Sequence, residues 1–271
     1  MIRRIIKLAI SAVFWACSEA WKVVLRIFGR PIPGTCVVLY YHVVKPEERE
    51  RFARQMDILL AVARPISIEN PPELEPGVHY AAVTFDDGFR KTIGIVLPEL
   101  KKRNIPITVF VPTGCLGSEP PWIRDRSSHH YGGAILTEDE IRKMDAEPLV
   151  SFGSHCVTHR LLPTLSDDEA GDEIWRSKAD LETILDHEVG SLSLPHGAFE
   201  QRHVDWAKQA GYSRVFSITP VLAFAHRDEF VIGRVRVDPT DWSAEFRLKL
   251  LGAYRWAVSL KKIFGSSNRH E

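Results

Sequence analysis

The sequence predicts an α/β protein with a parallel sheet, and two observations predict it. From Gly34 onward, short apolar runs rich in β-branched and aromatic residues alternate with patterns of helical period. Such repeated alternation is typical of a parallel sheet, either open or closed. The chain has 271 residues and is 45% apolar, so it can bury the core of one domain of α/β-barrel size.

Seven stretches have the pattern of strands and five have the period of helices. The expected strands are residues 36–41, 80–85, 107–111, 149–152, 191–194 and 214–218, with a late strand-like run at 231–237. The expected helices are residues 49–61, 91–102, 138–146, 167–186 and 201–210. Thr137 with Glu140 and Ser166 with Glu169 have the spacing of capping boxes, which marks two helix starts. The predicted catalytic domain spans residues 34–245.

Residues 1–30 are predicted to form a basic amphipathic helix. Polar residues recur at steps of three, four and seven between apolar positions, and Trp15 and Trp21 suit a membrane interface. The predominantly apolar run of residues 8–17 is shorter than the about 20 residues that cross a bilayer. We therefore expect a helix that lies on a membrane surface.

A signal peptide is the alternative for this segment. Its start is basic, residues 8–17 are apolar, and Ser18-Glu19-Ala20 offers a small-x-small cleavage site. The helical pattern continues through that site to Phe28, which favours a retained helix.

A second basic amphipathic helix, followed by a tail, is predicted at residues 246–271. Each terminal segment carries a net charge of about +5, so the middle of this chain of zero net charge is acidic. Basic ends suggest contact with anionic lipid, although two solvated helix faces would explain them equally well. The acidic body lacks a basic-aromatic surface pattern, which argues against nucleic-acid binding.

Ionisable residues follow four of the predicted strands at the point where each strand ends. His42 follows the first strand, Asp86 and Asp87 the second, and His155 and His196 two later ones. The carboxyl ends of parallel strands meet on one face of an α/β barrel, where active sites form. We therefore expect these side chains to lie close together.

Two spacings among these residues indicate a metal site. His155 and His159 are four residues apart and can place two imidazoles on one side of a turn. Asp86 and Asp87 crowd two negative charges that a cation would relieve. Two histidines and one aspartate suit Zn²⁺ or another first-row divalent ion and leave positions open for water and substrate. The four cysteines lack CxxC spacing, so a zinc–thiolate site is not expected.

Three motifs resemble, in order and spacing, those of the polysaccharide deacetylase family, also called the NodB-homology or carbohydrate esterase 4 family. They are TFDDG at 84–88, SHCVTH at 154–159 and LPHG at 194–197, and the similarity covers about residues 37–237. The resemblance implies a distorted (β/α)7-type, TIM-like barrel. It also implies metal-dependent hydrolysis of N-acetyl or related acyl groups on amino-sugar polysaccharides or glycans. The chain is most similar to the exopolysaccharide branch, which includes poly-N-acetylglucosamine deacetylases.

The resemblance implies roles for individual residues. Asp87, His155 and His159 would hold the metal, with zinc expected and cobalt or nickel as alternatives, and Asp86 would be the general base. The remaining candidates, for substrate or oxyanion binding near the mouth of the site, are Pro195, His196, Gly197 and His42.

The chain departs from the family pattern in two respects that concern catalysis. Ser193 stands where the third motif usually begins with an arginine that braces the base, and we expect Arg234 to take over that contact. No late strand ending in a histidine supplies a general acid, so His226 is the first substitute, with His42 and His196 as further candidates.

Three functions are open on the sequence alone. The first is deacetylation of an N-acetylhexosamine polymer or glycan at a membrane. The second is deacylation of a lipid-linked sugar, near whose carrier the basic ends would hold the chain. The third is a catalytically weak or inactive metal-containing protein that binds glycans or serves as a scaffold, as Ser193 and the missing acid suggest. We expect membrane association through the amphipathic ends, with the cytoplasmic face favoured over export.

Overall fold

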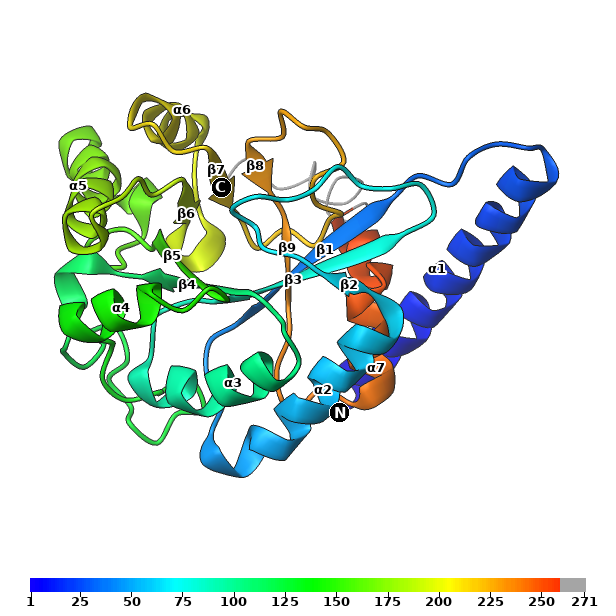
Figure 1. The fold of residues 1–271 in the computed structure, drawn as a ribbon, viewed down its shortest axis with the longest axis horizontal. Helices are drawn as coiled ribbons and strands as arrows, with labels where there is room; N and C mark the ends of the chain where they lie inside the picture. Colours follow the sequence, from blue (N-terminus) through cyan, green and yellow to red (C-terminus); the bar gives the residue numbers. More distant parts are fainter. Residues whose placement is uncertain (259–271) are drawn as a thin grey trace, which may run out of the picture.

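A parallel sheet forms the centre of the computed structural model, which describes residues 1–258 (Figure 1). Its strands are β1 (Thr35–Tyr41), β2 (Arg64–Pro65), β3 (His79–Phe85), β4 (Ile107–Val111), β5 (Val150–Ser154), β6 (Ser191–Ser193), β7 (Arg214–Phe216), β8 (Val231–Ile232) and β9 (Arg234–Arg236). They pair in the order β8-β7-β6-β5-β4-β3-β1-β9, with β2 beside β3, and each of these pairings is parallel. The predicted α/β fold with a parallel sheet is confirmed.

The two edge strands of the sheet, β8 and β9, are consecutive in the chain. β8 pairs with β7, β9 pairs with β1, and Gly233 alone separates β8 from β9. A Cβ atom at Gly233 would lie 2.3 Å from the carbonyl oxygen of Thr219 and 2.3 Å from Val221 Cγ2, so the close approach requires glycine. The sheet therefore curls so that its two edges lie next to each other in the segment that contains β8, Gly233 and β9. The break at Gly233 is the distortion expected for a (β/α)7-type barrel.

Helices connect the strands and flank the sheet (Figure 1). They are α1 (Ile2–Ile27), α2 (Arg49–Val62), α3 (Arg90–Lys102), α4 (Glu138–Asp145), α5 (Asp167–Leu185), α6 (Gln201–Gln209) and α7 (Ser243–Leu250). Both expected capping boxes are present, with Thr137 and Glu140 at the start of α4 and Ser166 and Glu169 at the start of α5. The predicted helices of the catalytic domain agree with these bounds to within a few residues.

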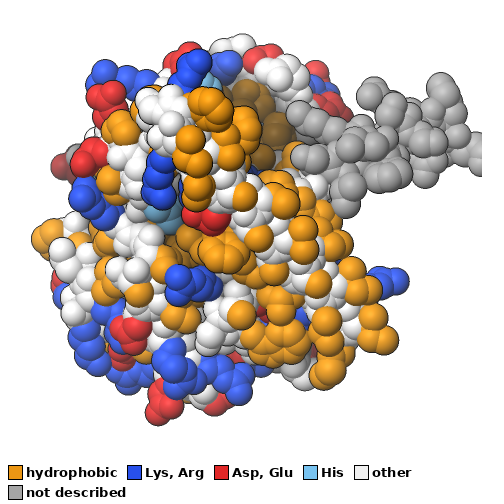
Figure 2. Space-filling view, turned by 90° about the vertical axis from the view of Figure 1, so that its right-hand side faces the viewer, with side chains coloured by type: hydrophobic (Ala, Val, Ile, Leu, Met, Phe, Trp, Pro, Cys, Tyr) orange, Lys and Arg blue, Asp and Glu red, His pale blue; other side chains and the backbone are white. Residues whose placement is uncertain are grey.

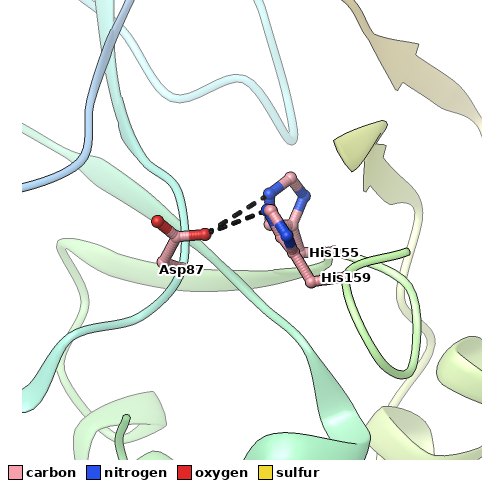
Figure 3. Close-up of side chains that lie close together, drawn as sticks. All are labelled: Asp87, His155 and His159. Atoms are coloured by element: carbon pink, nitrogen blue, oxygen red, sulfur yellow. Dashed lines mark ion pairs between the residues drawn. The ribbon is translucent and has the colours of Figure 1, made fainter. Parts of the chain in front are cut away.

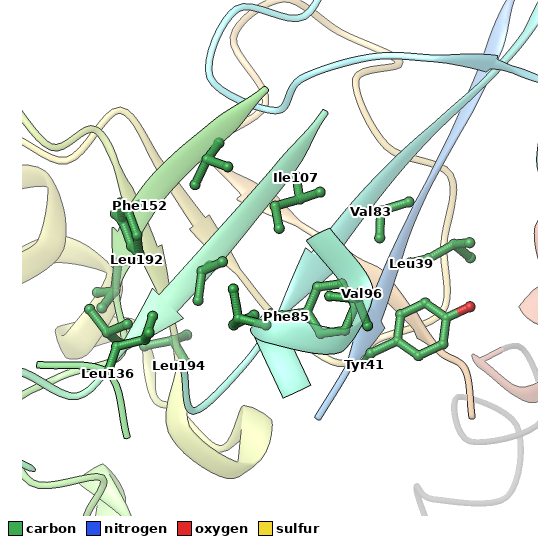
Figure 4. Close-up of a cluster of buried hydrophobic side chains, with 14 of the residues drawn as sticks. Leu39, Tyr41, Val83, Phe85, Val96, Ile107, Leu136, Phe152, Leu192 and Leu194 are labelled. Atoms are coloured by element: carbon green, nitrogen blue, oxygen red, sulfur yellow. The ribbon is translucent and has the colours of Figure 1, made fainter. Parts of the chain in front are cut away.

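Alternate strand residues face two separate apolar regions. Leu39 of β1 and Phe85 of β3 belong to the larger one, together with helix residues such as Val96 of α3 (Figure 4). Val38 and Ala82 belong to a smaller cluster drawn from strands and loops. Because strand side chains alternate between the two faces of a sheet, the larger cluster lies under the helices and the smaller one fills the inside of the curled sheet.

Near the C-terminus the structure differs from the predicted helix at 246–271. α7 begins earlier, at Ser243, and ends at Leu250, because Gly252 adopts a left-handed conformation with φ 69° before a short 3-10 turn. Phe246 and Leu250 are fully buried in the main core, so this helix packs on the barrel. The rest of the prediction, residues 259–271, lies outside the described residues.

The predicted N-terminal helix is present as α1, which extends beside the sheet (Figure 1). By length and composition, its 26 residues are apolar enough to cross a membrane. The whole helix is thus long enough to span a bilayer although residues 8–17 alone are not, because the apolar character continues along the helix on both sides of that run. α1 can serve as a membrane anchor or as a signal sequence.

Phe52→Ala is expected to destabilise the fold strongly. Phe52 is fully buried, and its ring centroid lies 5.4 Å from that of Tyr41 and 6.0 Å from that of Phe85. Loss of the ring leaves a cavity, so the free energy of unfolding in urea should fall by about 3–5 kcal/mol. Leu60→Ala, at an exposed position of the same helix, is the control and should change it by about 0.5 kcal/mol or less. Equal losses in both variants would contradict the packing described.

Candidate active site

A cavity of about 350 Å³ opens at the carboxyl ends of the strands. It is lined by Tyr40, His42, Asp86, Asp87, Trp122, Ile123, His130, His155, His159, Leu194, His196, Ile218 and Arg236. The structure therefore brings together the carboxylates and most of the histidines that the sequence singled out, and it does so on the expected face of the sheet.

The ends of β3 and β5 place the principal side chains of this cavity. Asp86 and Asp87 directly follow β3, and His155 directly follows β5. The amide of Asp86 donates to the carbonyl oxygen of Tyr41 at 2.9 Å, and the amide of His155 donates to that of Val111 at 2.9 Å. These bonds continue the strand ladders by one residue, so the side chains leave the sheet at fixed positions.

Several residues of the cavity have left-handed backbone. The φ angle is 69° at Asp87, 59° at His159 and 57° at His196. Such a conformation costs a non-glycine residue on the order of 1–3 kcal/mol and is concentrated at functional sites. Gly88 follows Asp87 with φ 64°, and a Cβ atom there would lie 2.6 Å from Val111 Cγ1. The surrounding fold therefore holds tight turns that direct these side chains into the cavity.

Asp87, His155 and His159 direct three ligand atoms toward one point (Figure 3). Asp87 Oδ1 lies 3.3 Å from His159 Nε2 and 3.7 Å from His155 Nε2, and all three residues are buried. Their ligand atoms lie within 4.8 Å of one another, as the ligands of one metal ion do. His155 Nδ1 donates to the backbone oxygen of Ser193 at 2.7 Å, which leaves Nε2 unprotonated and available as a ligand.

The surroundings of these three residues fit a bound cation. Among the described residues, Asp87 Oδ1 has no hydrogen-bond partner although it is buried, and it faces the unprotonated Nε2 of His155. Burial, followed by the charge of Asp86, raises the pKa of Asp87 well above its usual value. Burial, followed by the neighbouring His155 and His196, lowers the pKa of His159 to about 2. A divalent cation would favour the ionised Asp87 and suit the neutral imidazoles.

Asp86 is held by a buried two-point ion pair with Arg234. Arg234 Nη1 donates to Asp86 Oδ1 at 2.7 Å, and Nη2 donates to Asp86 Oδ2 at 2.8 Å. The same guanidinium donates to Ser193 Oγ at 2.8 Å and to Thr84 Oγ1 at 3.2 Å. β9 thus supplies the arginine that the third motif lacks, and Ser193 leaves room for it as a hydrogen-bond partner.

The two adjacent aspartates have opposite electrostatic environments. Burial acts to raise the pKa of Asp86, but the charges of Arg234 and His155 outweigh it and hold that pKa below its ordinary range. The pKa of Asp87 is raised instead. Neighbouring carboxyl groups whose pKa values are driven apart are characteristic of sites in which they have different roles.

Two further predicted histidines, His42 and His196, line the cavity. The ring centroid of His42 lies 5.5 Å from that of Tyr40, and burial is the main cause that lowers the pKa of His42 to about 4. His196 is exposed at the mouth, with its ring centroid 4.7 Å from that of His159. Both lie where a bound substrate can be reached.

The turn that carries the third motif offers one free candidate for an oxyanion donor. Pro195 has no N–H group, and the amide of Gly197 donates to the carbonyl oxygen of Leu194 at 2.9 Å. Of the three predicted residues, His196 is therefore the one whose amide can serve.

His226 lies in a different part of the molecule. It lines a second cavity, of about 600 Å³, together with Gly34 and Arg214. These neighbours lie at the amino ends of β1 and β7, opposite the cavity that holds Asp87. The structure therefore contradicts the expectation that His226 is the general acid. Its position in the sequence was compatible with that role, but a bridge between Ala223 and Cys36 directs the loop back to the start of β1.

Sequence reasoning missed the role of Trp122 as a wall of the cavity. Its ring stacks on that of His159, with centroids 4.1 Å apart and planes at 18°. Trp122 comes from the long connection before α4, where no periodic pattern predicts the path of the chain. Arg236 also lines the cavity, and the two-residue period of its strand does place it on the same face as Arg234.

An α/β fold with an Asp-His-His cluster beside a braced aspartate can hold a metal ion next to a group that accepts a proton. The polysaccharide deacetylase family model matches residues 74–215, a range that contains all three motifs. The chain belongs to the polysaccharide deacetylase family. The family is named for the deacetylation of polysaccharides.

Individual relatives are consistent with this assignment. The Bacillus subtilis protein YxkH, named as a polysaccharide deacetylase, is 26% identical over 165 residues, which cover 61% of this chain and 54% of YxkH. The chain thus spans about half the length of this curated relative.

Solved structures show the same fold at low sequence identity. The Streptococcus pyogenes deacetylase PplD in complex with acetate has a TM-score of 0.65 at 22% identity, over 80% of this chain and 99% of that one. IcaB from Ammonifex degensii has a TM-score of 0.66 at 24% identity, over 81% and 98%. At these identities the similarity shows the fold, and the substrate has to be inferred from the site.

His155→Ala is expected to weaken metal binding by more than about 100-fold, because loss of an outer hydrogen bond to a ligand alone costs about 10–100-fold. Titration calorimetry of chelator-treated protein with Zn²⁺ measures the affinity. His187→Ala is the control, since this histidine is exposed, pairs with Asp145 and lies outside every cluster of candidate metal ligands among the described residues. Unchanged zinc affinity in His155→Ala would remove this residue from the ligand set.

Arg234→Gln is expected to lower kcat by about 100-fold, because a displaced catalytic group loses its alignment. Without the guanidinium, the pKa of Asp86 should rise, so the acid limb of the pH–rate profile should move to higher pH. Arg236→Gln, which removes a nearby charge without touching Asp86, should leave that limb in place. If the limb stays in place in Arg234→Gln as well, Arg234 does not control the base.

Proposed function

We propose that this chain is a metal-dependent deacetylase that hydrolyses N-acetyl groups of an amino-sugar polysaccharide or glycan, with zinc as the preferred metal and cobalt or nickel as alternatives. One observation carries the proposal. A buried carboxylate and two neutral imidazoles converge beside a second carboxylate that Arg234 keeps ionised. This arrangement separates a group that can bind a cation from a group that can accept a proton.

Asp86 is the base in this proposal. A divalent metal held by Asp87, His155 and His159 would polarise the acyl carbonyl and make a water molecule more acidic. Asp86 is ionised, lies next to that cluster and is not part of it. Arg234 donates to both carboxylate oxygens, and Ser193 Oγ donates to Oδ1 at 3.4 Å. A second acceptor position on Oδ2 is left for the proton of the attacking water.

His196 is the residue best placed to complete the reaction. Its amide can donate to the oxyanion that forms when water attacks the acyl carbon. Its exposed ring can exchange protons with solvent and so protonate the departing amine. His42 is the less suitable acid, since a pKa of about 4 leaves it unprotonated at neutral pH. The products are acetate and a free amino sugar.

The braced Asp86 supports catalysis over a scaffold role. The scaffold alternative rested on Ser193 and on the lack of an evident acid. Arg234 now makes the contact that an arginine at position 193 would otherwise make, and His196 lies at the mouth of the cavity. Similarity of the three motifs to the exopolysaccharide branch supports a polymer of N-acetylglucosamine type as substrate.

A lipid-linked amino sugar is the second candidate substrate, and α1 is the observation that favours it. Arg4, near the start of α1, donates to the carbonyl oxygen of Thr240, in the loop that leaves the carboxyl end of β9. A membrane-bound α1 would therefore bring the open end of the barrel close to lipid headgroups. Neither substrate indicates on which side of the membrane the catalytic domain lies.

Incubation with N-acetylglucosamine oligomers is expected to release acetate and free amine in equal amounts when Zn²⁺, Co²⁺ or Ni²⁺ is supplied. Asp86→Asn should lower the rate by about 10²–10⁴-fold, because the base is lost while the metal ligands remain. Acetate and primary amine are measured separately, and metal content is measured in both proteins. A lipid-linked N-acetyl amino sugar is tested in parallel.

The outcomes separate the candidates. Faster turnover of the lipid-linked sugar than of every soluble oligomer would select the second substrate. If the protein binds metal but releases no amine from any substrate with any of the three ions, deacetylation is refuted and the scaffold role is supported.

A further inference from the structure

α1 turns its polar side toward the protein. Its buried and half-buried positions recur at steps of three and four residues, and we call them the polar stripe. The stripe consists of the polar residues Arg4, Ser11, Ser18, Glu19 and Lys22, with Leu8, Phe14 and Leu25 between them. Ser11, at the centre of this stripe, is fully buried. A helix on the surface of a water-soluble domain normally does the reverse and buries its apolar residues.

The opposite half of α1 is apolar and exposed. At 3.6 residues per turn it consists of Ile2, Ile5, Ile6, Ala9, Ile10, Ala12, Val13, Ala16, Cys17, Ala20, Val23, Val24 and Ile27. We call this the outer apolar face. Val13 is 64% exposed and Ile27 is 74% exposed. Figure 2, drawn from the side on which α1 lies, shows hydrophobic side chains gathered into a broad patch.

Specific polar contacts fix the inner side of α1 to the domain. Arg4 Nε donates to Glu245 Oε2 at 2.6 Å, and Arg4 Nη2 donates to the carbonyl oxygen of Thr240 at 2.8 Å. Two turns further along, Ser11 Oγ accepts from Trp256 Nε1 at 2.8 Å. Glu245 is buried, so removal of residues 1–20 would take away a close cationic partner of a buried carboxylate. These contacts favour a helix that is retained.

We propose that α1 is a monotopic anchor, whose outer apolar face inserts into one leaflet of a lipid bilayer while its polar stripe stays on the domain. Burial of a long apolar helix face in the acyl boundary is the usual mode of interfacial helices. A spanning orientation would pull Arg4 and Ser11 from their partners and carry Glu19 and Lys22 into hydrocarbon, which is costly. The proposal does not depend on the deacetylase reaction.

The charges around the outer apolar face favour lipid, and not a second copy of the chain, as the partner that covers this face. Arg3 and Lys7 are exposed on one flank of the outer apolar face, Arg26 is exposed on the other flank, and Arg30 lies just beyond the end of α1. Two copies paired through their outer apolar faces would bring these cations together, whereas anionic headgroups would attract them. Trp21, which is 62% exposed, is of the residue type that favours the headgroup region.

This anchor sets the direction in which the cavity opens. α1 begins beside Thr240, at the carboxyl end of β9, and its end leads through residues 28–34 to the amino end of β1. The helix therefore runs along the barrel from the cavity end to the opposite end. With the outer apolar face in the bilayer, the cavity opens along the membrane surface and not away from it.

Sedimentation with vesicles of phosphatidylcholine and phosphatidylglycerol tests the insertion. The wild-type chain should bind, and Ile6→Glu combined with Val13→Glu should lower binding by about 10-fold or more, because two charges enter the apolar face. Leu60→Glu combined with Leu161→Glu places the same charges at exposed apolar positions elsewhere and should bind as wild type. Equal binding of all three proteins would overturn the proposal. Amine release from soluble oligomers reports on the site separately, so loss of vesicle binding and loss of catalysis are distinguishable.

Cysteine labelling tests the orientation. Among the described residues the cysteines other than Cys17 are buried, so Arg3→Cys and Arg30→Cys are each introduced together with Cys17→Ala. On sealed vesicles, an impermeant maleimide added on the side of the domain should label both positions.

Three results would overturn the anchor. Labelling of position 3 only from the opposite side would show a spanning helix. A mature chain without residues 1–20, found by mass spectrometry of protein isolated from cells, would show a signal peptide. A dimer in solution that Ile6→Glu with Val13→Glu dissolves would place a second copy on the outer apolar face.

Discussion

The buried ion pair between Arg234 and Asp86 is the interaction on which the candidate site depends. Arg234 belongs to β9, which pairs with β1, whereas Asp86 follows β3 on the other side of β1. Breaking such a buried pair by removing one partner costs about 3–5 kcal/mol, so neither charge is stable there alone. The sheet must therefore curl far enough to bring both strands to β1 before Asp86 is held. Curling of the sheet and assembly of the base are therefore coupled.

The same pair explains how two adjacent aspartates come to differ. The guanidinium compensates the negative charge of Asp86, while Asp87 has two imidazoles in front of it and no hydrogen-bond partner among the described residues for Oδ1. The chain turns sharply at Asp87, with φ 69°, so the two side chains point into different surroundings. A single residue step thus separates a group suited to accept a proton from a group suited to bind a cation.

Much of this site could be predicted because its residues follow strands. Asp86 and His155 occupy the first positions after β3 and β5, and the rule that parallel strands end on one face placed them together. The same reasoning failed for His226, since it sits in a loop whose direction is set by a distant bridge between Ala223 and Cys36. Trp122 could not be predicted at all, because stacking on a histidine leaves no periodic signal in a long loop.

The sequence by itself determined the alternation of strands and helices, the three motifs and the amphipathic character of α1, because each depends on residues that are near one another in the chain. Only the tertiary structure decided which partner each charged group has. It placed Arg234 against Asp86 across 148 positions of sequence, and it turned the polar stripe of α1 inward through Arg4 and Glu245, 241 positions apart. The physical reason is that the period of a helix or strand indicates which residues share a face. What surrounds that face is determined by contacts between residues that are far apart in the sequence.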